Sequence, residues 1–284
     1  MFKISSKTKI VGIFGYPIKH SLSPVMHNEC FRNLKLDYVY VAFCVRPQDI
    51  KTAVESIRVL NIRGVNVTIP HKESVIKYID SIHPLAEEIG AVNTIVNDGK
   101  KLTGYNTDAT GFLRSLNEEK IDIKDKKVLL LGAGGAAKSI STVLVKNNIK
   151  SIFVMDIDTL RAKTLVEKLK LNTRKCKIEY IENQSIEKII QEIDILINAT
   201  PVGMNKTDQC VIKPSLLHKN LFVYDIIYNV RTKLIQECIK RKIRFLDGTK
   251  MLLFQAIEAF ELWTDKKPPV NLMYNILLKE RQKC

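Results

Sequence analysis

The chain has 284 residues, of which 45% are hydrophobic and 26% charged, so it can form one large domain or two ordinary ones. No apolar run approaches the ~20 residues that cross a bilayer, so we expect no membrane-spanning segment. The net charge of +15 is spread along the chain without a basic block interleaved with aromatic residues, which argues against nucleic-acid binding.

The segment 1–15 has a cationic start, but its apolar residues alternate with polar ones and lead into Tyr16-Pro17. This pattern is typical of a first strand and not of the apolar core of a signal peptide. The six cysteines include no Cys-x-x-Cys pair and no cluster with histidine at zinc-binding spacing. We therefore expect a cytoplasmic protein with free thiols and no bound metal.

Predicted strands alternate with predicted helices over residues 1–106. The expected strands are 9–15, 38–45, 64–70, 91–98 and 101–107. The expected helices are 23–34, 47–60, 71–79 and 84–89. The last two strands flank Asp98-Gly99, a strong turn signal, and so predict a hairpin.

The next part of the chain, to about residue 248, also alternates apolar strands with helices. The expected strands are 127–131, 151–156, 176–181, 193–200 and 221–228. The expected helices are 108–119, 136–147 and 159–171. This order predicts a parallel, doubly wound sheet. The last part is expected to be helical, at 251–263 and again from Val270 onward.

A glycine cluster, Gly132-Ala133-Gly134-Gly135-Ala136-Ala137, joins the apolar strand 127–131 to the next helix. It fits Gly-x-Gly-x-x-Ala, in which Gly132 allows the tight turn and Gly134 lets the backbone approach a pyrophosphate. The free N–H groups of the helix N-terminus favour an anion there. Because a buried strand precedes the cluster and an amphipathic helix follows, we interpret it as a dinucleotide-binding loop, against the alternative of a turn needed only for packing.

Two acidic residues, Asp156 and Asp158, end the strand 151–156. An acid about twenty residues beyond the glycine loop binds the ribose hydroxyls of adenosine and repels a 2′-phosphate. Arg161, one helical turn further on, is the nearest cation. We therefore expect NAD to be favoured over NADP. The alternative, that one or both aspartates cap the helix 159–171, stays open, and both interpretations can hold because two acids are present.

Polar residues also gather at predicted strand ends and turns near the N-terminus. Ser21 and Ser23 precede a helix, and capping of that helix explains Ser23 but not Ser21. Asn66 and Thr68 share one side of their strand because side chains alternate along it. Lys72 follows at an expected helix start, where a cation is electrostatically unfavourable, which makes it a candidate functional group.

Further hydrogen-bonding groups stand at Asn93, Asn106, Thr107 and Asp108, again at strand or helix ends. Asp108 has a structural alternative, since it could be the N-cap of the helix 108–119.

These segments together resemble the shikimate/quinate dehydrogenase family almost from end to end. The motifs that carry the resemblance are Gly15-Tyr16-Pro17-Ile18 with Ser21 to His27, Asn66 to Lys72, Gly90 to Thr94, Gly104 to Asp108, the glycine loop, Asn198 to Met204, Asp225 to Asn229, and Gly248 with Met251 to Gln255.

The resemblance implies an α/β enzyme of two domains with a cleft between them. Residues 1–107 and 249–284 would form a substrate-binding and catalytic α/β domain, and 108–248 a Rossmann-like, doubly wound dinucleotide-binding domain. The implied activity is the reversible, NAD(P)-dependent reduction of 3-dehydroshikimate to shikimate in the chorismate pathway of aromatic amino acid biosynthesis. The implied partner is this small substrate, with no nucleic acid or membrane, for a monomer or homodimer.

Roles for individual residues follow from the same resemblance. Lys72 and Asp108 are the implied catalytic pair, and both also bind substrate. The other implied substrate-binding residues are Ser21, Ser23 and Tyr228 at the carboxylate and Asn66, Thr68, Asn93 and Gln255 at the ring hydroxyls. The implied cofactor-binding residues are Gly132, Ala133, Gly134, Gly135, Ala136, Asp156, Asp158 and Arg161, with Thr200, Val202 and Gly248 at the nicotinamide. An ammonium group against a carbonyl oxygen can supply a proton or stabilise developing negative charge, which agrees with the role of Lys72.

The chain departs from the family pattern at two places. NADP-using members typically carry an Asn-Arg-Thr type segment where this chain has Asp156-Ile157-Asp158, so it is closer here to NAD-using or dual-cofactor members. Lys250 stands where the family often has glycine, which bears on the loop near the nicotinamide.

Three alternatives stay open from the residues alone. Quinate could replace shikimate, since the two rings differ at the carbon bearing the carboxylate and Ser23 is compatible with either. A catalytically silent sensor on the same fold would be expected to lack Lys72 or Asp108, or to carry a DNA-binding module. A methylenetetrahydrofolate dehydrogenase would leave the two serines and the hydroxyl-binding set without explanation.

Overall fold

The computed structural model describes residues 4–173, 175–205 and 207–282, and these form two compact units. Unit 1 comprises residues 4–111 and 253–282, and unit 2 comprises residues 112–252. The chain crosses from one unit to the other inside two helices, α4 (Thr107–Glu118) and α9 (Thr249–Thr264). The expected domain boundaries, at 107/108 and 248/249, fall at the beginnings of these helices.

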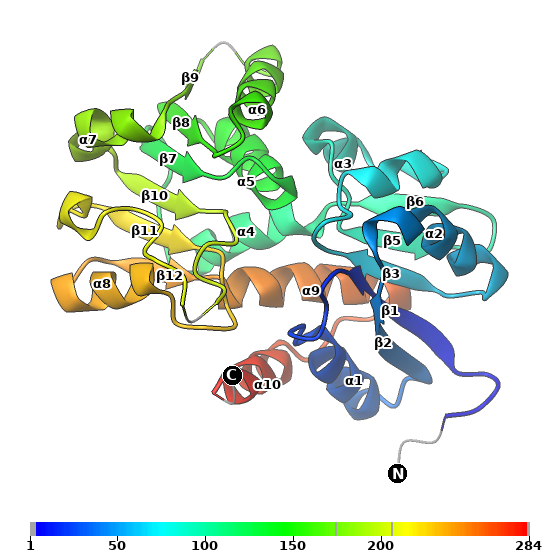
Figure 1. The fold of residues 1–284 in the computed structure, drawn as a ribbon. Helices are drawn as coiled ribbons and strands as arrows, with labels where there is room; N and C mark the ends of the chain where they lie inside the picture. Colours follow the sequence, from blue (N-terminus) through cyan, green and yellow to red (C-terminus); the bar gives the residue numbers. More distant parts are fainter. Residues whose placement is uncertain (1–3, 174, 206, 283–284) are drawn as a thin grey trace. The chain divides into compact units, whose positions relative to one another are not determined.

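Unit 1 is built on a mixed sheet with the strand order β2-β1-β3-β5-β6-β4 (Figure 1). Its strands are β1 (Lys9–Gly15), β2 (Tyr38–Cys44), β3 (Gly64–Val67), β4 (Ser81–Ile82), β5 (Thr94–Asn97) and β6 (Leu102–Tyr105). β1 pairs in parallel with β2 and β3, and β4 with β6, whereas β5 is antiparallel to both of its neighbours. The antiparallel pair β5 and β6 confirms the hairpin predicted around Asp98-Gly99.

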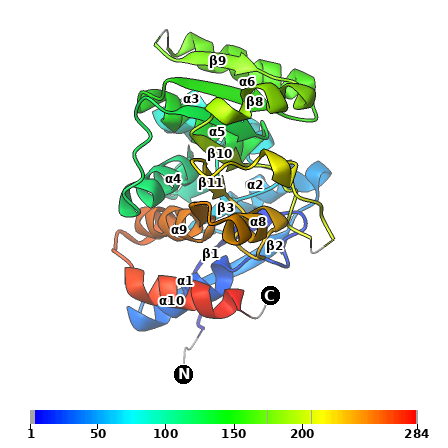
Figure 2. The ribbon, with the colours of Figure 1, turned by 90° about the vertical axis from the view of Figure 1, so that its left-hand side faces the viewer.

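The helices of unit 1 are α1 (Ser23–Asn33), α2 (Ile50–Val59), α3 (Pro84–Ile89), α10 (Val270–Arg281) and parts of α4 and α9. α1 and α10 lie side by side in two perpendicular views (Figures 1 and 2). The indole of Trp263, on α9, is fully buried and donates a hydrogen bond to the carbonyl oxygen of Ile95 on β5 (3.0 Å). A Cβ at Gly64 would lie 2.3 Å from the Trp263 Nε1 atom, so only glycine at this position of β3 lets α9 approach the sheet.

Unit 2 contains an all-parallel sheet with the strand order β12-β11-β10-β7-β8-β9. Its strands are β7 (Lys127–Leu131), β8 (Ser151–Met155), β9 (Lys177–Tyr180), β10 (Ile195–Asn198), β11 (Phe222–Asp225) and β12 (Phe245–Asp247). The order runs outward in both directions from β7 and β10, which is the arrangement of a doubly wound dinucleotide-binding sheet. The predicted α/β fold class is confirmed.

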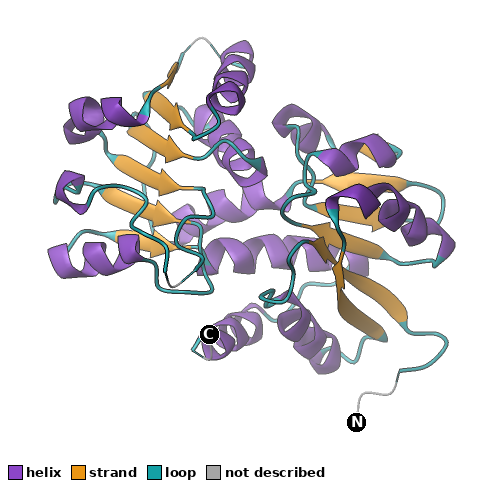
Figure 3. Ribbon diagram, in the orientation of Figure 1, coloured by secondary structure: helices purple, strands orange, loops and turns teal. Residues whose placement is uncertain are grey.

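Helices α5 (Gly135–Lys146), α6 (Thr159–Leu171) and α8 (Lys233–Arg241) contact the strands of unit 2, and α7 (Ile186–Ile189) is a short additional helix (Figure 3). The strand β7 is buried along its apolar part, with Val128, Leu129, Leu130 and Leu131 each fully inaccessible to solvent. Such a continuous apolar run is what a parallel strand covered on both faces requires. None of the helices among the described residues is long and apolar enough to cross a membrane.

Three predictions about the elements are wrong or incomplete. The helix expected at 71–79 is a 3₁₀ helix over Ser74–Tyr78. The short strands β4 and β12, with two and three residues, were not predicted, because a period of two cannot be recognised over so few positions. The helix α8 was not predicted either, although its apolar residues Leu234, Ile235 and Cys238 follow helical spacing.

Candidate active site

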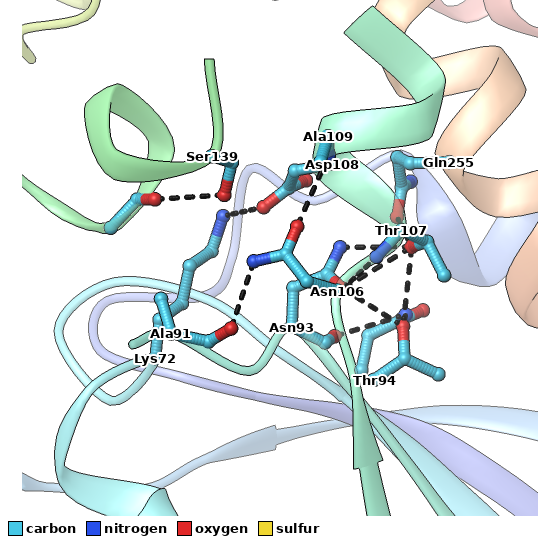
Figure 4. Close-up of polar contacts among 12 residues, drawn as sticks. Lys72, Ala91, Asn93, Thr94, Asn106, Thr107, Asp108, Ala109, Ser139 and Gln255 are labelled. Carbon is cyan, nitrogen blue, oxygen red and sulfur yellow. Dashed lines mark hydrogen bonds and ion pairs between the residues drawn. The ribbon is translucent and has the colours of Figure 1, made fainter. Parts of the chain in front are cut away.

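Lys72 and Asp108 form an ion pair within unit 1 (Figure 4). Lys72 follows the end of β3 by five residues, Asp108 lies in the first turn of α4, and the Lys72 Nζ atom donates to the Asp108 Oδ2 atom at 2.6 Å. Their side chains are only 14% and 9% exposed, so the two charges are largely shielded from solvent. Lys72 is not at a helix start, and its placement is explained by the carboxylate that it meets.

The helix α4 is capped by Asn106 and not by Asp108. The Asn106 Oδ1 atom accepts a hydrogen bond from the backbone N–H of Ala109 (3.1 Å), and its Nδ2 atom donates to the carbonyl oxygen of Ala91 (2.8 Å) (Figure 4). The alternative that Asp108 is the helix cap is therefore wrong. Because Asn106 satisfies the helix N-terminus, the Asp108 carboxylate is available to Lys72.

Amide side chains surround this pair on the same unit. The Asn93 Oδ1 atom accepts from the Thr107 backbone N–H (2.7 Å), and the Asn93 Nδ2 atom donates to the Thr107 Oγ1 atom (2.9 Å). The Thr107 hydroxyl lies 3.5 Å from the Gln255 Oε1 atom on α9 (Figure 4). Asn93 and Gln255 are 3% and 7% exposed, so both are fixed in orientation by buried contacts.

Asn66 extends the same network from β3. Its Oδ1 atom accepts from the Tyr40 hydroxyl (2.7 Å), and its Nδ2 atom donates to the Thr94 Oγ1 atom (3.0 Å) and to the carbonyl oxygen of Asn93 (3.3 Å). Thr68 lies one residue beyond the end of β3 and is half-buried, so the expected strand to residue 70 is shorter in the structure. Tyr40 was not among the predicted site residues. Its hydroxyl reaches Asn66 from β2, and residue spacing along the sequence does not reveal such a contact between strands.

Ser21 and Ser23 precede α1. The Ser21 Oγ atom accepts from the Ser23 backbone N–H at 3.3 Å, and the helix N-cap is Leu22, which has no side-chain capping bond. The suggestion that Ser23 caps the helix is therefore wrong, and the serine with a local structural role is Ser21. The Ser23 side chain is buried and Ser21 is half-buried.

The glycine loop of unit 2 lies between β7 and α5, as predicted. Gly132 has a φ of +104°, and a Cβ there would lie 2.8 Å from the Ala199 carbonyl oxygen, so glycine is required. Gly134 is the N-cap of α5. The three atoms nearest to a Cβ at Gly134 would all belong to the Arg161 guanidinium, the nearest at 3.6 Å. The backbone of the loop thus faces a cation, which suits an anionic ligand.

The two aspartates after β8 are both bound to backbone N–H groups. The Asp156 Oδ2 atom accepts from the Ala133 N–H in the glycine loop (2.6 Å), and its Oδ1 atom accepts from the Asp158 N–H (2.9 Å). The Asp158 Oδ1 atom accepts from the Arg161 N–H (3.0 Å) and caps α6. The capping alternative is confirmed for Asp158, while Asp156 instead stabilises the turn at Ala133.

The remaining predicted cofactor residues of unit 2 stand at the ends of its strands. The Thr200 hydroxyl donates to the Asn198 Oδ1 atom (2.7 Å), and Val202 is 39% exposed. A Cβ at Gly248 would lie 1.9 Å from the Ile226 carbonyl oxygen, so this glycine permits a close crossing of two backbones. Tyr228 is half-buried three residues beyond β11.

Lys250, which departs from the family pattern, has a partner in unit 2. Its Nζ atom forms a short ion pair with the Glu119 carboxylate, just beyond the end of α4, and Arg244 donates to the Glu119 carbonyl oxygen (3.1 Å). The lysine therefore joins the beginning of α9 to the region after α4.

Two buried polar residues of unit 2 were missed, Asn198 and Asp225, at the ends of β10 and β11. The available signal was a polar residue at the end of each of two apolar runs, since fully buried polar side chains are rarely without a purpose.

Family models match most of the chain. Residues 13–95 match the shikimate dehydrogenase substrate binding domain, 115–226 match shikimate/quinate 5-dehydrogenase, and 248–278 match the shikimate 5′-dehydrogenase C-terminal domain.

Two curated relatives are similar over nearly their full length. A shikimate dehydrogenase (NADP(+)) of Methanobrevibacter smithii is 44% identical over 97% of this chain and 98% of its own. The enzyme of the same name from Methanothermobacter thermautotrophicus is 42% identical over 96% of this chain and 97% of its own.

Three of the solved structures that resemble this chain are also shikimate or quinate dehydrogenases. A shikimate dehydrogenase in complex with NADP+ has a TM-score of 0.89 and 38% identity, covering 98% of this chain and 97% of its own. Shikimate 5-dehydrogenase from Listeria monocytogenes, in complex with shikimate and NAD, has a TM-score of 0.86 and 39% identity, covering 97% and 98%. Quinate dehydrogenase from Corynebacterium glutamicum, in complex with NAD, has a TM-score of 0.87 and 30% identity, covering 96% and 99%.

The dehydrogenase model matched to residues 115–226, together with the doubly wound sheet and its glycine loop, shows that the chain is a nicotinamide-dependent oxidoreductase. The three matched models and the extended identity then decide the family. The chain belongs to the shikimate dehydrogenase family.

The expectation that NAD is favoured over NADP is wrong. The curated relatives at 42–44% identity are named as NADP(+) enzymes. The expectation assumed that Asp156 and Asp158 would present carboxylates to the ribose and repel a 2′-phosphate. Both carboxylates instead accept hydrogen bonds from the chain's own backbone, and the Arg161 guanidinium stands beside Gly134.

Proposed function

We propose that this enzyme catalyses the NADP-dependent, reversible reduction of 3-dehydroshikimate to shikimate, with unit 1 binding the substrate and unit 2 the cofactor. The main support is the ion pair of Lys72 and Asp108 at 2.6 Å, set among buried amide side chains. The family models matched to the two regions, a substrate binding domain at 13–95 and a dehydrogenase domain at 115–226, support the same division.

Lys72 is the proposed proton donor. A nicotinamide cofactor bound by unit 2 would supply a hydride to the carbonyl carbon, so that negative charge would develop on the carbonyl oxygen. The Lys72 ammonium donates a proton to that oxygen in the reduction and takes it back in the oxidation. Asp108 holds the ammonium in place at 2.6 Å.

Asn66, Asn93 and Gln255 are proposed to recognise the ring hydroxyls, together with Thr68. Each of the three amides is already held by a buried neighbour, which fixes the direction of its remaining donor or acceptor. A substrate analogue without a hydroxyl would leave such a group unpaired, which costs more than the lost bond alone. Ser21 and Ser23 are proposed to bind the carboxylate, and the role of Tyr228 beside it stays a prediction.

The residues present in unit 2 fit a phosphorylated dinucleotide. Gly132 allows the tight turn after β7, and Gly134 is the N-cap of α5, so the first N–H groups of this helix lie at the glycine loop. We propose that the pyrophosphate is held there and that Arg161 pairs with the 2′-phosphate, with Thr200, Val202 and Gly248 near the nicotinamide. The localisation in the cytoplasm and the state of assembly, monomer or homodimer, stay predictions.

Initial rates with shikimate and with quinate, each with NADP+ and with NAD+, test the proposed activity. We expect the highest kcat/KM for shikimate with NADP+. Dominant turnover of quinate would replace the substrate, an alternative that the solved quinate dehydrogenase keeps open at 30% identity. No turnover in any of the four combinations would contradict the proposed activity and favour a silent sensor on this fold.

A further inference from the structure

A cluster of buried polar side chains ties together two loops of unit 2. Asn198 and Asp225 are paired residues at the ends of the adjacent parallel strands β10 and β11, and both are fully inaccessible to solvent. Thr232, the N-cap of α8, is 4% exposed and completes the cluster. Among the described residues, no lysine or arginine forms an ion pair with Asp225, and the three side chains are held by hydrogen bonds.

Asn198 uses all of its hydrogen-bonding capacity. Its Oδ1 atom accepts from the Thr200 backbone N–H (3.1 Å) and from the Thr200 hydroxyl (2.7 Å). Its Nδ2 atom donates to the Val202 carbonyl oxygen (3.2 Å) and to the Asp225 Oδ1 atom (3.0 Å). An amide has two donors and two acceptor sites, so one side chain fixes both Thr200 and Val202.

Asp225 links this loop to the chain that follows β11. Besides accepting from Asn198, its Oδ1 atom accepts from the Ile227 N–H (3.2 Å), and its Oδ2 atom accepts from the Thr232 hydroxyl (2.7 Å). Ile227 immediately precedes Tyr228. Burial raises the pKa of Asp225 to about 6, although these hydrogen bonds oppose the shift by favouring the charged form.

The loop after β10 has little apolar packing to hold its shape. Val202 and Met204 are each 39% exposed, and Gly203 has a φ of +108°. The far side of the loop is held by another carboxylate, since the Asp208 Oδ2 atom accepts from the N–H groups of Gly203 (2.8 Å) and Asn205 (3.1 Å). Because the Val202 and Met204 side chains are partly exposed, the conformation of the loop depends on the hydrogen bonds that its backbone forms with Asn198 and Asp208.

We propose that Asn198, Asp225 and Thr232 are positioning residues, which hold Thr200 and Val202 ready for the nicotinamide and set the path of the chain to Tyr228. This inference rests on the function proposed above. Preorganisation of this kind lowers the ordering cost of binding, so its loss weakens binding and slows turnover without removing any group that contacts the reacting atoms.

Asn198→Asp is the first variant, because it exchanges one NH₂ group for an oxygen at constant shape. It keeps the acceptor for Thr200, removes both donors, and places two carboxylates together. We expect amide hydrogen exchange over residues 198–208 of the free protein to become at least about 10-fold faster. We expect Kd for NADP+ to rise about 10-fold with a lower kcat, while Kd for adenosine 2′,5′-bisphosphate, which lacks nicotinamide, stays unchanged.

Thr232→Val and Thr232→Ser form a matched pair that tests the proposed positioning role even if Asn198→Asp does not fold. Valine keeps the methyl group that approaches Gly203 but loses the hydroxyl, whereas serine keeps the hydroxyl and loses the methyl. We expect faster exchange at 198–208 and weaker NADP+ binding with valine, and parent-like values with serine. Thr232 also caps α8, so exchange over 233–241 must be followed in parallel.

The inference is overturned if folded Asn198→Asp matches the parent in exchange and NADP+ affinity. It is also overturned if valine and serine at position 232 behave alike, or if only α8 loses protection. A parent that does not oxidise shikimate would contradict the proposed function instead, since the exchange experiment needs neither substrate nor turnover.

Discussion

The candidate sites of the two units are built from different kinds of group, side chains in unit 1 and backbone in unit 2. In unit 1 the candidate site consists of side chains, with the charged pair of Lys72 and Asp108 among buried amides. In unit 2 the candidate site consists mostly of backbone, with the tight turn at Gly132 and the N-terminus of α5 at Gly134. Chemistry that needs a proton requires an ionisable side chain, whereas a phosphate can be bound by N–H groups that every residue has.

This difference has a topological origin. All the strands of the sheet of unit 2 are parallel, so their carboxyl ends, and the loops that follow them, share one edge. In unit 1, β5 runs antiparallel to β3 and β6, so the polar residues Asn66 and Asn93 come together from a strand end and a strand beginning. We therefore expect substitutions in unit 1 to affect turnover first, and those in unit 2 to affect cofactor affinity first.

The largest effect is expected for Lys72→Met. Loss of the proton donor should lower kcat by about 10²–10⁴-fold, with a smaller change in KM for shikimate. Steady-state kinetics with NADP+ would measure both, and Lys77→Met, at an exposed lysine five residues further on, is the control. A variant with the kcat of the parent would remove Lys72 from the mechanism.

Gly132→Ala should have the next largest effect, mainly on NADP+ affinity. A Cβ there meets the Ala199 carbonyl oxygen at 2.8 Å and adds the strain of a φ of +104°. We expect about 1–3 kcal/mol of lost stability in chemical denaturation, and a Kd for NADP+ raised by about 10-fold or more.

Gly99→Ala is the matched control. Gly99 has a φ of +88° but no atom within 4 Å of an added Cβ, so it carries the strain without the clash. Equal losses of stability in the two variants, with NADP+ affinity retained, would show that the glycine loop is only a turn.

Arg161→Ala tests the proposed contact with the 2′-phosphate. Kd for NADP+ should rise about 10- to 150-fold while Kd for NAD+ changes little, because a charge-assisted hydrogen bond contributes about 1.5–3 kcal/mol. Lys163→Ala, on the same helix but over the Tyr180 ring, is the control in calorimetric titrations. Equal losses for the two cofactors would place the phosphate elsewhere.

The smallest effect concerns a buried titratable group outside the candidate site. His27 is fully buried, stacks on Tyr40 with ring centroids 4.5 Å apart, and neither of its ring nitrogens has a hydrogen-bond partner in the part of the chain that the structure describes. Burial lowers its pKa from 6.5 to about 3. Between these values the unfolded chain binds the proton and the folded protein does not, so stability falls as the pH falls below about 6.5.

From pH 7 to pH 5.5 this contribution amounts to about 1 kcal/mol. Asp225 acts in the opposite direction, since its raised pKa of about 6 makes it stabilise the fold as the pH falls. Denaturation curves of the parent and of His27→Phe, taken at both pH values, separate the two, because only the histidine contribution is lost in the variant. An identical pH dependence in both proteins would contradict the assignment to His27.

How well each element can be predicted from the sequence depends on the number of positions over which its hydrophobic pattern repeats. The long apolar strands and periodic helices were found because their patterns repeat over many positions, as in β7 and α6. The roles of neighbouring polar residues were not predictable, since their spacing does not show which side chain accepts a hydrogen bond from the backbone. Asn106, not Asp108, caps α4, and Asp156 bonds to Ala133. The cofactor was predicted wrongly for the same reason.

The buried Trp263 has a consequence for the order of folding during synthesis. Unit 2 is contiguous, so its last residue, Leu252, is made before α9 is complete. Unit 1 lacks Trp263, and with it the partner of Ile95, until α9 has been translated. On the ribosome, unit 2 is thus the first unit that can fold, and the fluorescence of this one tryptophan reports when unit 1 folds.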